Sequence, residues 1–166
     1  WGCGRNMGTE IERKFLVRGI AWRDAAKTEP CRQGYLAYGP PVAVRVRIMG
    51  GVATLNIKTS TTAIRRHEFE YEIPLVDAES ILATSCAGAI VEKTRHCVEY
   101  GGRTWEVDVF EGANAGLVVA EIELDSEDEV FERPPWLGRE VSGDPRYLNT
   151  SLCQRPYSEW SPEERE

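Results

Sequence analysis

Polar and apolar residues alternate along most of this chain, with the period of two that is typical of β-strands. The first alternating stretch, residues 9–17, places Glu10, Glu12 and Lys14 on one face and apolar residues such as Phe15 on the other. By itself this stretch is also typical of a strand with one face in water. The same alternation returns in residues 32–38, 42–49, 52–59, 65–73, 89–100, 104–110 and 117–124. The pattern therefore predicts eight strands.

Glycine pairs and short helical patterns connect these strands. Gly50-Gly51 and Gly101-Gly102 are two-residue hairpin signals. Mostly antiparallel strands with short turns form barrels or sandwiches, and closure removes the exposed sheet edges. We therefore predict a mainly β (α+β) fold, an eight-stranded antiparallel closed β-barrel, or tunnel, with a few short peripheral helices. Helical segments are predicted at residues 22–27, ended by Pro30; at residues 78–86, capped by Asp77; at residues 125–131; and at residues 146–153.

The length and composition favour one domain. The chain has 166 residues, of which 42% are hydrophobic and 28% charged, as expected for a globular protein with a sizeable core. We expect the domain to span residues 7–155. Residues 1–6 precede Met7 and are expected to be a tag remnant or a loose extension. Residues 156–166 form a charged C-terminal tail, which we expect to fray from Glu159 onward.

Charge and cysteine content exclude several classes of protein. The net charge of −7 argues against a general nucleic-acid-binding protein, which would normally be basic. Five scattered cysteines without a CxxC pair are expected to be reduced thiols. No run approaches 18 apolar residues, so no membrane span is expected, and without a visible signal peptide we expect a cytoplasmic protein. The apolar outward faces of the strands are compatible with a homodimer or with cover by helices.

Charged residues fall on one face of strand after strand, and arginine is frequent among them. If this face lines a lumen, water and ions must fill the lumen, because so many charges in a dry space would be costly. Arginine forks match phosphate oxygens, and carboxylates bind Mg²⁺ or Mn²⁺ beside phosphates. A small polyanion with several phosphates, bound with one or two divalent ions, suits both sets. The basic residues of this face are Lys14, Arg45, Arg47, Lys58, Arg66, Lys93 and Arg95, and the acidic ones are Glu10, Glu12, Glu68, Glu70, Glu106, Asp108, Glu121 and Glu123.

No competing chemistry has comparable support. The two histidines, His67 and His96, lack the spacing of metal ligands, and His67 falls on the face opposite to Glu68. Neither a P-loop nor a GxSxG nucleophile elbow is present. Four of the five tryptophans, Trp22, Trp105, Trp136 and Trp160, are expected in an acidic chain to be packing anchors rather than stacking platforms for nucleic-acid bases.

The first strand carries a motif of a known family. Glu10-Ile-Glu-Arg-Lys14 is an ExExK motif that resembles the CYTH superfamily, the triphosphate tunnel metalloenzymes. The resemblance covers about residues 8–155 and is closest to the compact bacterial members that hydrolyse inorganic triphosphate. It implies an eight-stranded antiparallel tunnel. The other motifs that carry it follow in order: Gln33-Gly-Tyr-Leu36, Val44-Arg-Val-Arg47, Leu55-Asn-Ile-Lys58, Arg66-His-Glu-Phe-Glu70, Val91-Glu-Lys-Thr-Arg95, Trp105-Glu-Val-Asp-Val-Phe110, Ala120-Glu-Ile-Glu-Leu124 and Asp144-Pro-Arg-Tyr-Leu-Asn149.

The resemblance also implies roles for single residues. Asp108 would orient basic neighbours or a metal-bound water. Leu148 stands where the family commonly has a polar residue, often Lys, so no substrate contact is implied there, although Arg146 and Tyr147 are retained. The implied metal ligands are Glu10, Glu12, Glu68, Glu70, Glu121 and Glu123. The implied phosphate-binding groups are Lys14, Arg45, Arg47, Lys58, Arg66, Lys93, Arg95 and Arg146. The implied catalytic residues are Glu10, Glu12, Lys14, Lys93 and Asp108.

These roles predict a metal-dependent phosphoanhydride hydrolase that converts inorganic triphosphate to pyrophosphate and phosphate. One Mg²⁺ or Mn²⁺ would neutralise charge on the phosphates, and a second would orient and acidify the attacking water. Alternatives within the family are a thiamine triphosphatase, another nucleoside or organic triphosphate phosphohydrolase, and a class IV-type adenylate cyclase. For these, Tyr35, Tyr38 or Phe110 could stack on a ring. A non-catalytic polyphosphate-binding module is the alternative from another class.

Overall fold

Within the residues that the structure describes, the fold consists of nine strands and two α-helices. The computed structural model describes residues 8–23, 27–39, 41–60 and 64–165. The strands are β1 (Gly8–Val17), β2 (Lys27–Ala37), β3 (Val42–Met49), β4 (Val52–Ser60), β5 (Arg65–Glu72), β6 (Ala87–Tyr100), β7 (Arg103–Phe110), β8 (Val118–Glu123) and β9 (Leu137–Glu140). The α-helices are α1 (Leu75–Thr84) and α2 (Asn149–Gln154), and short 3₁₀ turns cover Gly112–Asn114, Pro145–Tyr147, Tyr157–Glu159 and Pro162–Arg165.

Eight of the strands form a closed antiparallel barrel, as predicted. The strand order is β5-β4-β3-β2-β6-β7-β8-β1, and pairing of β5 with β1 closes the ring. The long strand β1 carries two partners along one edge, because β5 pairs with Gly8–Ile11 and β9 pairs between Phe15 and Val17. The ninth strand was not predicted. It has only four residues, and its sequence, Leu-Gly-Arg-Glu, lacks the alternation that marks the other strands.

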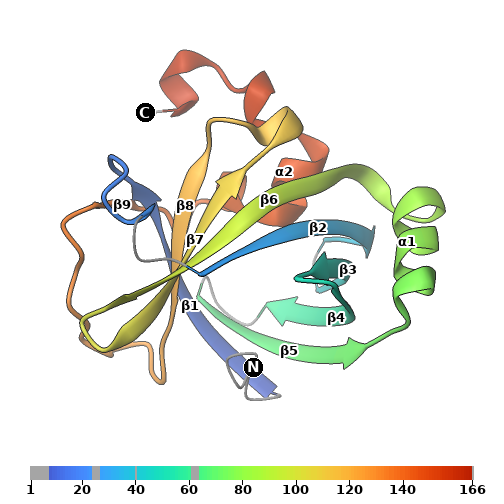
Figure 1. The fold of residues 1–166 in the computed structure, drawn as a ribbon, viewed down its shortest axis with the longest axis horizontal. Coiled ribbons are helices and arrows are strands. Elements are labelled where there is room, and N and C mark those ends of the chain that lie inside the picture. The colour runs from blue at the N-terminus through green and yellow to red at the C-terminus, as the bar shows by residue number, and fades with distance from the viewer. Residues whose placement is uncertain (1–7, 24–26, 40, 61–63, 166) are drawn as a thin grey trace.

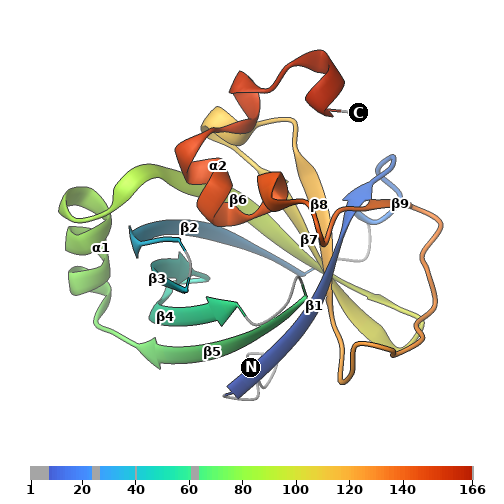
Figure 2. The same ribbon diagram turned by 180° about the vertical axis from the view of Figure 1, so that it is seen from behind.

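The hydrophobic cores lie outside the ring of strands, and the charged face points inward. Helix α1 covers the outer face of β3 and β4, where Val46, Ala53 and Leu82 are buried together. Helix α2 and the C-terminal turns cover another part of the ring against β6, as Figures 1 and 2 show from opposite sides. A third cluster packs Phe15 and Trp105 beneath the segment that carries β9. The predicted orientation of the strand faces is therefore confirmed.

Two glycine hairpins set the register of the strands that carry basic residues. Gly50 and Gly51 have φ values of +57° and +84°, the left-handed conformation that a tight hairpin turn requires. Gly101 and Gly102 adopt the same conformation between β6 and β7. The first turn pairs Arg45 with Asn56 in β4, so both side chains point to the interior. Both predicted hairpins are confirmed.

Several predicted element boundaries were wrong. Lys27 begins β2 rather than ending a helical turn; residues 24–26 of that predicted turn lie outside the described residues. Pro30 lies within β2, just beyond the residues that pair with β3, so its missing N–H breaks no bond to that strand. Helix α1 begins at Leu75, directly after Pro74, so Asp77 lies in its first turn instead of capping it.

Two predicted helices near the C-terminus also differ from the structure. Residues 125–131 form turns without a helix. The helix predicted over residues 146–153 is interrupted at Leu148, whose extended conformation (φ −71°, ψ 139°) separates a 3₁₀ turn from α2. Directly after this interruption, Asn149 and Thr150 of α2 line a cavity inside the barrel.

Some surface features leave earlier expectations open. None of the described helices has the length and apolar character needed to cross a bilayer. The four cysteines within the described residues are free thiols. Phe69 and Tyr71 remain exposed on the outer face of β5, and Val76 is exposed on α1. The homodimer therefore stays a prediction.

The described part of the C-terminal tail packs against the domain through Trp160, although we expected fraying from Glu159 onward. Trp160 is only 4% exposed, which confirms it as a packing anchor. Its ring meets those of Tyr147 and Tyr157 at centroid distances of 5.1 Å each, and its Nε1–H donates to the carbonyl of Arg155. The tail therefore braces the segment that precedes α2.

Replacement of Trp160 by alanine should destabilise the domain. Removing a large buried aromatic side chain typically costs about 3–5 kcal/mol in the free energy of unfolding. Urea unfolding followed by circular dichroism would measure this loss. Val130→Ala is the control, because Val130 is 94% exposed and its truncation should change stability by less than about 0.5 kcal/mol. An unchanged unfolding midpoint in Trp160→Ala would mean that the tail contributes nothing to the fold.

Candidate active site

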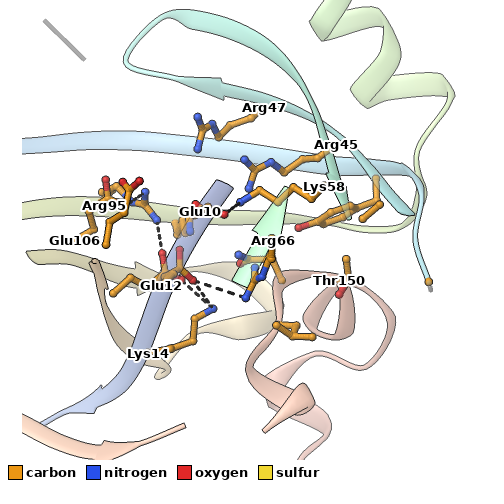
Figure 3. A pocket seen from close by; sticks show the side chains of 18 of the residues that line it. Glu10, Glu12, Lys14, Arg45, Arg47, Lys58, Arg66, Arg95, Glu106 and Thr150 are labelled. Atoms are coloured by element: carbon orange, nitrogen blue, oxygen red, sulfur yellow. Dashed lines mark hydrogen bonds and ion pairs between the residues drawn. The ribbon is translucent and has the colours of Figure 1, made fainter. Parts of the chain in front are cut away.

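A cavity of about 350 Å³ lies inside the barrel, and every barrel strand contributes to its wall (Figure 3). Most of the charged residues predicted from the sequence line it. The basic lining residues are Lys14, Arg45, Arg47, Lys58, Arg66, Lys93 and Arg95, and the acidic ones are Glu10, Glu12, Glu106, Glu121 and Glu123. The other lining residues are Tyr35, Gly39, Pro41, Ala43, Leu148, Asn149 and Thr150. Basic groups outnumber acidic ones in this wall, so the cavity suits a multiply charged anion.

Four predicted site residues do not line the cavity. Asp108 is fully buried behind the basic residues of β6. Glu68 is buried beside Arg45 and Lys58, and Glu70, whose side chain is 28% exposed, bonds to Arg47. Arg146 lies outside the barrel, where its guanidinium group bonds to Asp144 and stacks near Trp160. The structure thus divides the predicted residues into a lining layer and a supporting layer.

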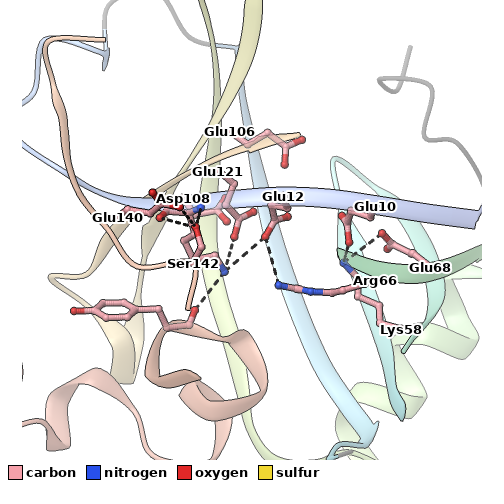
Figure 4. Close-up of polar contacts among 12 residues, drawn as sticks. Glu10, Glu12, Lys58, Arg66, Glu68, Glu106, Asp108, Glu121, Glu140 and Ser142 are labelled. Carbon is pink, nitrogen blue, oxygen red and sulfur yellow. Dashed lines mark hydrogen bonds and ion pairs between the residues drawn. The ribbon is translucent and has the colours of Figure 1, made fainter. Parts of the chain in front are cut away.

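A connected network holds the basic residues of β1 and β6 in place, and Figure 4 shows its carboxylates Glu12, Asp108 and Glu121. Lys14 Nζ is 2.9 Å from a Glu121 carboxylate oxygen and also donates to the backbone carbonyl of Tyr147 at 3.3 Å. Arg95 donates to Asp108 and to Glu121, at 2.7 Å and 2.9 Å. These contacts follow from the sheet register, which places Lys14 opposite Glu121 and Arg95 opposite Asp108.

The network fixes the charge state of its members. Burial alone would raise the pKa of the Glu121 carboxyl, but Lys14 and Arg95 outweigh burial and hold that pKa well below its usual range. Burial likewise opposes ionisation of Asp108, yet Arg95 and Lys93 lower its pKa. Burial disfavours the Lys14 ammonium, but Glu121 and Glu12 raise its pKa overall. All of these groups therefore stay ionised near neutral pH.

A second network holds the basic residues of β3 and β4 in place. Lys58 Nζ lies 2.9 Å from Glu10 and 3.3 Å from Glu68. Arg47 bonds to Glu70 at 2.7 Å. Asn56, which is fully buried, donates its side-chain N–H groups to both Glu68 and Glu70. The two supporting carboxylates are thereby tied to protein donors.

Glu12 differs from the other carboxylates because its basic neighbours are distant. Lys14 Nζ is 3.9 Å away and Arg66 Nη2 is 4.0 Å away. Burial raises the pKa of the Glu12 carboxyl, and the adjacent Glu121 and Glu10 raise it further. Glu123 lies directly opposite Glu12 in the pairing of β1 with β8. This part of the wall therefore carries negative charge that the protein does not fully neutralise.

A hard divalent cation fits this concentration of carboxylate oxygens. Within the part of the chain that the structure describes, no three His, Cys, Asp or Glu side chains converge tightly enough to form a metal site as they stand. Glu10, Glu12, Glu121 and Glu123 all face the cavity, whereas Glu68 and Glu70 do not. The donor set is therefore compatible with Mg²⁺ or Mn²⁺ at the β1–β8 side of the cavity.

Some lining residues were not among the predicted site residues. Glu106 alternates with Asp108 on β7, so the charged-face pattern already indicated its position, and it bonds to Arg95. Tyr35 follows from the alternation of β2 in the same way. Asn149 and Thr150 reach the cavity from α2, and the strand pattern contains no signal for them. Leu148 also lines the cavity, as an uncharged residue near its end.

Comparisons with known proteins agree with this architecture. The CYTH domain profile matches residues 8–157. An inorganic triphosphatase of Acetivibrio thermocellus is 49% identical over 151 residues, which is 91% of this chain and 97% of that protein. An inorganic triphosphatase of Nitrosomonas europaea is 38% identical over 149 residues, covering 87% and 97% of the two chains. A crystal structure of an inorganic triphosphatase superposes with a TM-score of 0.66 at 35% identity and covers 90% of this chain and 97% of that one.

Replacement of Asp108 by asparagine should be strongly destabilising. Lys93 and Arg95 share this carboxylate, and removal of one partner from a buried ion pair costs about 3–5 kcal/mol because the remaining charges stay desolvated. Urea unfolding would measure the loss. The matched control is Glu79→Gln, which breaks an exposed pair with Arg32 and should cost less than about 1 kcal/mol. Equal losses in the two variants would rule out a supporting role for Asp108.

Proposed function

This chain belongs to the CYTH family, and we propose that it is an inorganic triphosphatase, which hydrolyses triphosphate to pyrophosphate and phosphate with a divalent metal ion. The observation that carries this proposal is the composition of the cavity wall. Seven basic side chains line it together with a cluster of carboxylates whose negative charge is not fully neutralised. A polyphosphate bound together with a divalent cation complements both parts. The match to this chain covers 97% of each of the two relatives that are named inorganic triphosphatases, which supports the same conclusion.

The basic residues would bind and orient the triphosphate. Arg47 and Arg95 are held by Glu70 and Asp108, so their guanidinium groups need little reorganisation when phosphate oxygens arrive. Lys14 is held between Glu121 and the carbonyl of Tyr147. Phosphoryl transfer depends mainly on such positioning and on electrostatic stabilisation. No side chain is required as a nucleophile.

We propose Glu10, Glu12, Glu121 and Glu123 as the residues that hold the metal. When bound, Mg²⁺ or Mn²⁺ would offset charge on the phosphates and activate the attacking water. Glu68 and Glu70, which the family resemblance also implied as ligands, do not line the cavity and are tied to Asn56. We propose that these two carboxylates hold Lys58 and Arg47 in place instead. Arg146 lies outside the cavity, so a direct phosphate contact by Arg146 has no support from the geometry.

A second candidate function is hydrolysis of a triphosphate that carries an organic group. One part of the cavity wall is uncharged, and it consists of Tyr35, Pro41, Ala43, Leu148 and Thr150. An aromatic ring and aliphatic side chains could contact a base or another ring. The similarity to two relatives that are named inorganic triphosphatases favours inorganic triphosphate as the substrate.

A comparison of substrates separates these functions. We expect phosphate release from inorganic triphosphate with Mg²⁺ or Mn²⁺, and no release with EDTA. ATP and thiamine triphosphate should be hydrolysed much more slowly under the same conditions. Faster hydrolysis of either organic substrate would favour the second candidate, and pyrophosphate formation from ATP without phosphate would indicate a cyclase. Binding of triphosphate without any release would indicate a polyphosphate-binding module.

Replacement of Glu12 by glutamine should abolish turnover without harming the fold. An amide is a weak metal ligand, and loss of a ligand should cost at least about 100-fold in activity, since changes behind the ligands already cost 10- to 100-fold. The raised pKa of Glu12 means that its ionised form destabilises the folded state above the normal pKa. The neutral variant should therefore be at least as stable as the parent at pH 7.

Phosphate release and urea unfolding would be measured on the same samples, with Glu79→Gln as the control for loss of an exterior carboxylate. Loss of activity with unchanged stability would support Glu12 as a metal ligand. Metal-dependent activity retained in Glu12→Gln would remove this residue from the metal site.

A further inference from the structure

Arg45 has an unusual environment among the basic residues of the cavity. It is 6% exposed, and among the described residues its Nε and Nη2 atoms have no hydrogen-bond partner at normal geometry, although burial raises the pKa of the Tyr35 hydroxyl and Arg45 lies close enough to help lower it. The nearest carboxylate oxygen, on Glu68, is 3.6 Å from Nη2. The third nitrogen, Nη1, donates to the side-chain oxygen of Gln33 at 3.5 Å. Two of the three guanidinium nitrogens are thus buried beside the cavity without a partner at normal hydrogen-bond geometry.

Most other basic residues of the wall are closely paired with carboxylates. Lys14 and Lys58 each lie 2.9 Å from a glutamate, and Arg47 lies 2.7 Å from Glu70. Lys93 and Arg95 share Asp108. Burial opposes the charge of Arg66, but Glu12, at 4.0 Å, together with Glu10 and Glu121 raises its pKa, and these are carboxylates that we assign to the metal. Among the basic residues of the wall that lie away from the proposed metal ligands, Arg45 is therefore the one whose charge is neutralised least.

Gln33 occupies the place that a carboxylate takes beside the other arginines. It is fully buried on the inner face of β2, opposite Arg47 in the sheet register. Its side-chain oxygen accepts from Arg45 and its Nε2 has no partner. A neutral acceptor orients a guanidinium group without cancelling its charge, whereas a glutamate in its place would form a charge-assisted pair.

The other groups near Arg45 do not supply this missing pairing. Burial raises the pKa of the Tyr35 hydroxyl, and the charge and hydrogen bonding of Arg45 only partly oppose that effect, so Tyr35 stays a neutral neighbour of Arg45. Glu68 divides its carboxylate between Lys58 and the amide of Asn56. Arg45 therefore lines the cavity with a positive charge that no carboxylate of the described residues neutralises within hydrogen-bond distance.

We propose that Gln33 is a positioning residue for triphosphate binding: it holds the Arg45 guanidinium group through a neutral hydrogen bond and so leaves its charge for a phosphate oxygen. The inference rests on the proposed function, because it takes inorganic triphosphate as the ligand of the cavity. It extends that function to a residue that does not line the cavity. The identity of residue 33 then sets the affinity for the anion through Arg45.

The test compares Gln33→Glu and Gln33→Leu with the parent. Glutamate should pair with Arg45 and raise the KM for inorganic triphosphate, measured with Mg²⁺, by about tenfold or more, since a hydrogen bond to a charged group is worth at least that factor. Leucine removes the acceptor without adding charge and should raise KM less. Gln154→Glu, which adds the same charge on the exposed face of α2, should leave KM unchanged. Urea unfolding of each variant reports whether it folds.

A double-mutant cycle with Arg45→Ala identifies the route of the effect. Arg45→Ala should itself raise KM, and Gln33→Glu should add little in that background, because its partner is gone. The exterior variant Arg32→Ala controls for loss of an arginine from the adjacent part of β2. An unchanged KM in folded Gln33→Glu would overturn the inference. An equal increase with and without Arg45 would overturn the proposed route through Arg45.

Calorimetric titration of inorganic triphosphate in EDTA separates this inference from the proposed function. If the parent neither binds triphosphate nor releases phosphate from it, the proposed function fails. If the parent binds and hydrolyses triphosphate but the Gln33 variants match it in both affinity and KM, only the inference fails. Weaker binding by Gln33→Glu than by Gln33→Leu, with both variants folded, would support the inference because only charge pairing predicts that order.

Discussion

A charge buried inside this barrel must have a partner, and the rest of the structure depends on this requirement. Desolvated ions are tolerated only when opposite charges and hydrogen-bond donors surround them. Arg95 meets the requirement with Asp108, Glu106 and Glu121, which come from two neighbouring strands. Such pairs form only if the strands keep one register, because a shift by one residue would turn every inner side chain outward. The chemistry of the interior and the closure of the sheet are therefore coupled.

A charged interior moves the hydrophobic core to the outside of the ring. The outer faces of the strands carry the apolar residues, and elements outside the ring must cover them. Helix α1 covers β3 and β4, while α2 and the tail cover the region around Tyr147. The tail also affects the interior, since the backbone carbonyl of Tyr147 accepts from Lys14. Peripheral packing and the geometry of the cavity are thus linked through one residue.

The strands and their inner faces could be predicted from the sequence because alternation is a local property. The glycine pairs at positions 50–51 and 101–102 added the hairpins, since few other residues adopt their conformation. Strand β9 could not be predicted, because its four residues form a strand only where β1 offers an unpaired edge beyond β5. The packing of Trp160 depends in the same way on Tyr147, a contact across the fold.

The sequence predicted which charged residues point to the interior, but not which of them line the cavity and which support the lining residues. Alternation placed Asp108, Glu68 and Glu70 correctly on the inner face, but it could not show that their basic partners line the cavity while these carboxylates do not. Arg146 follows no strand pattern, and its position depends on the turn at Asp144. The role of Gln33 could not be predicted from the charge pattern either. Its neutral side chain has no place in a charge pattern, and its relation to Arg45 appears only in three dimensions.

The incompletely paired groups indicate where a ligand would act. If stability alone determined the interior, every charge would be paired as Lys93 is with Asp108. Glu12 instead carries unneutralised negative charge, and Arg45 keeps a positive charge that no carboxylate of the described residues neutralises within hydrogen-bond distance. Each destabilises the unliganded protein, and each would be satisfied by one component of a metal–polyphosphate ligand. Because one group is acidic and the other basic, neither a cation nor an anion alone would satisfy both, which favours a ligand that brings the two together.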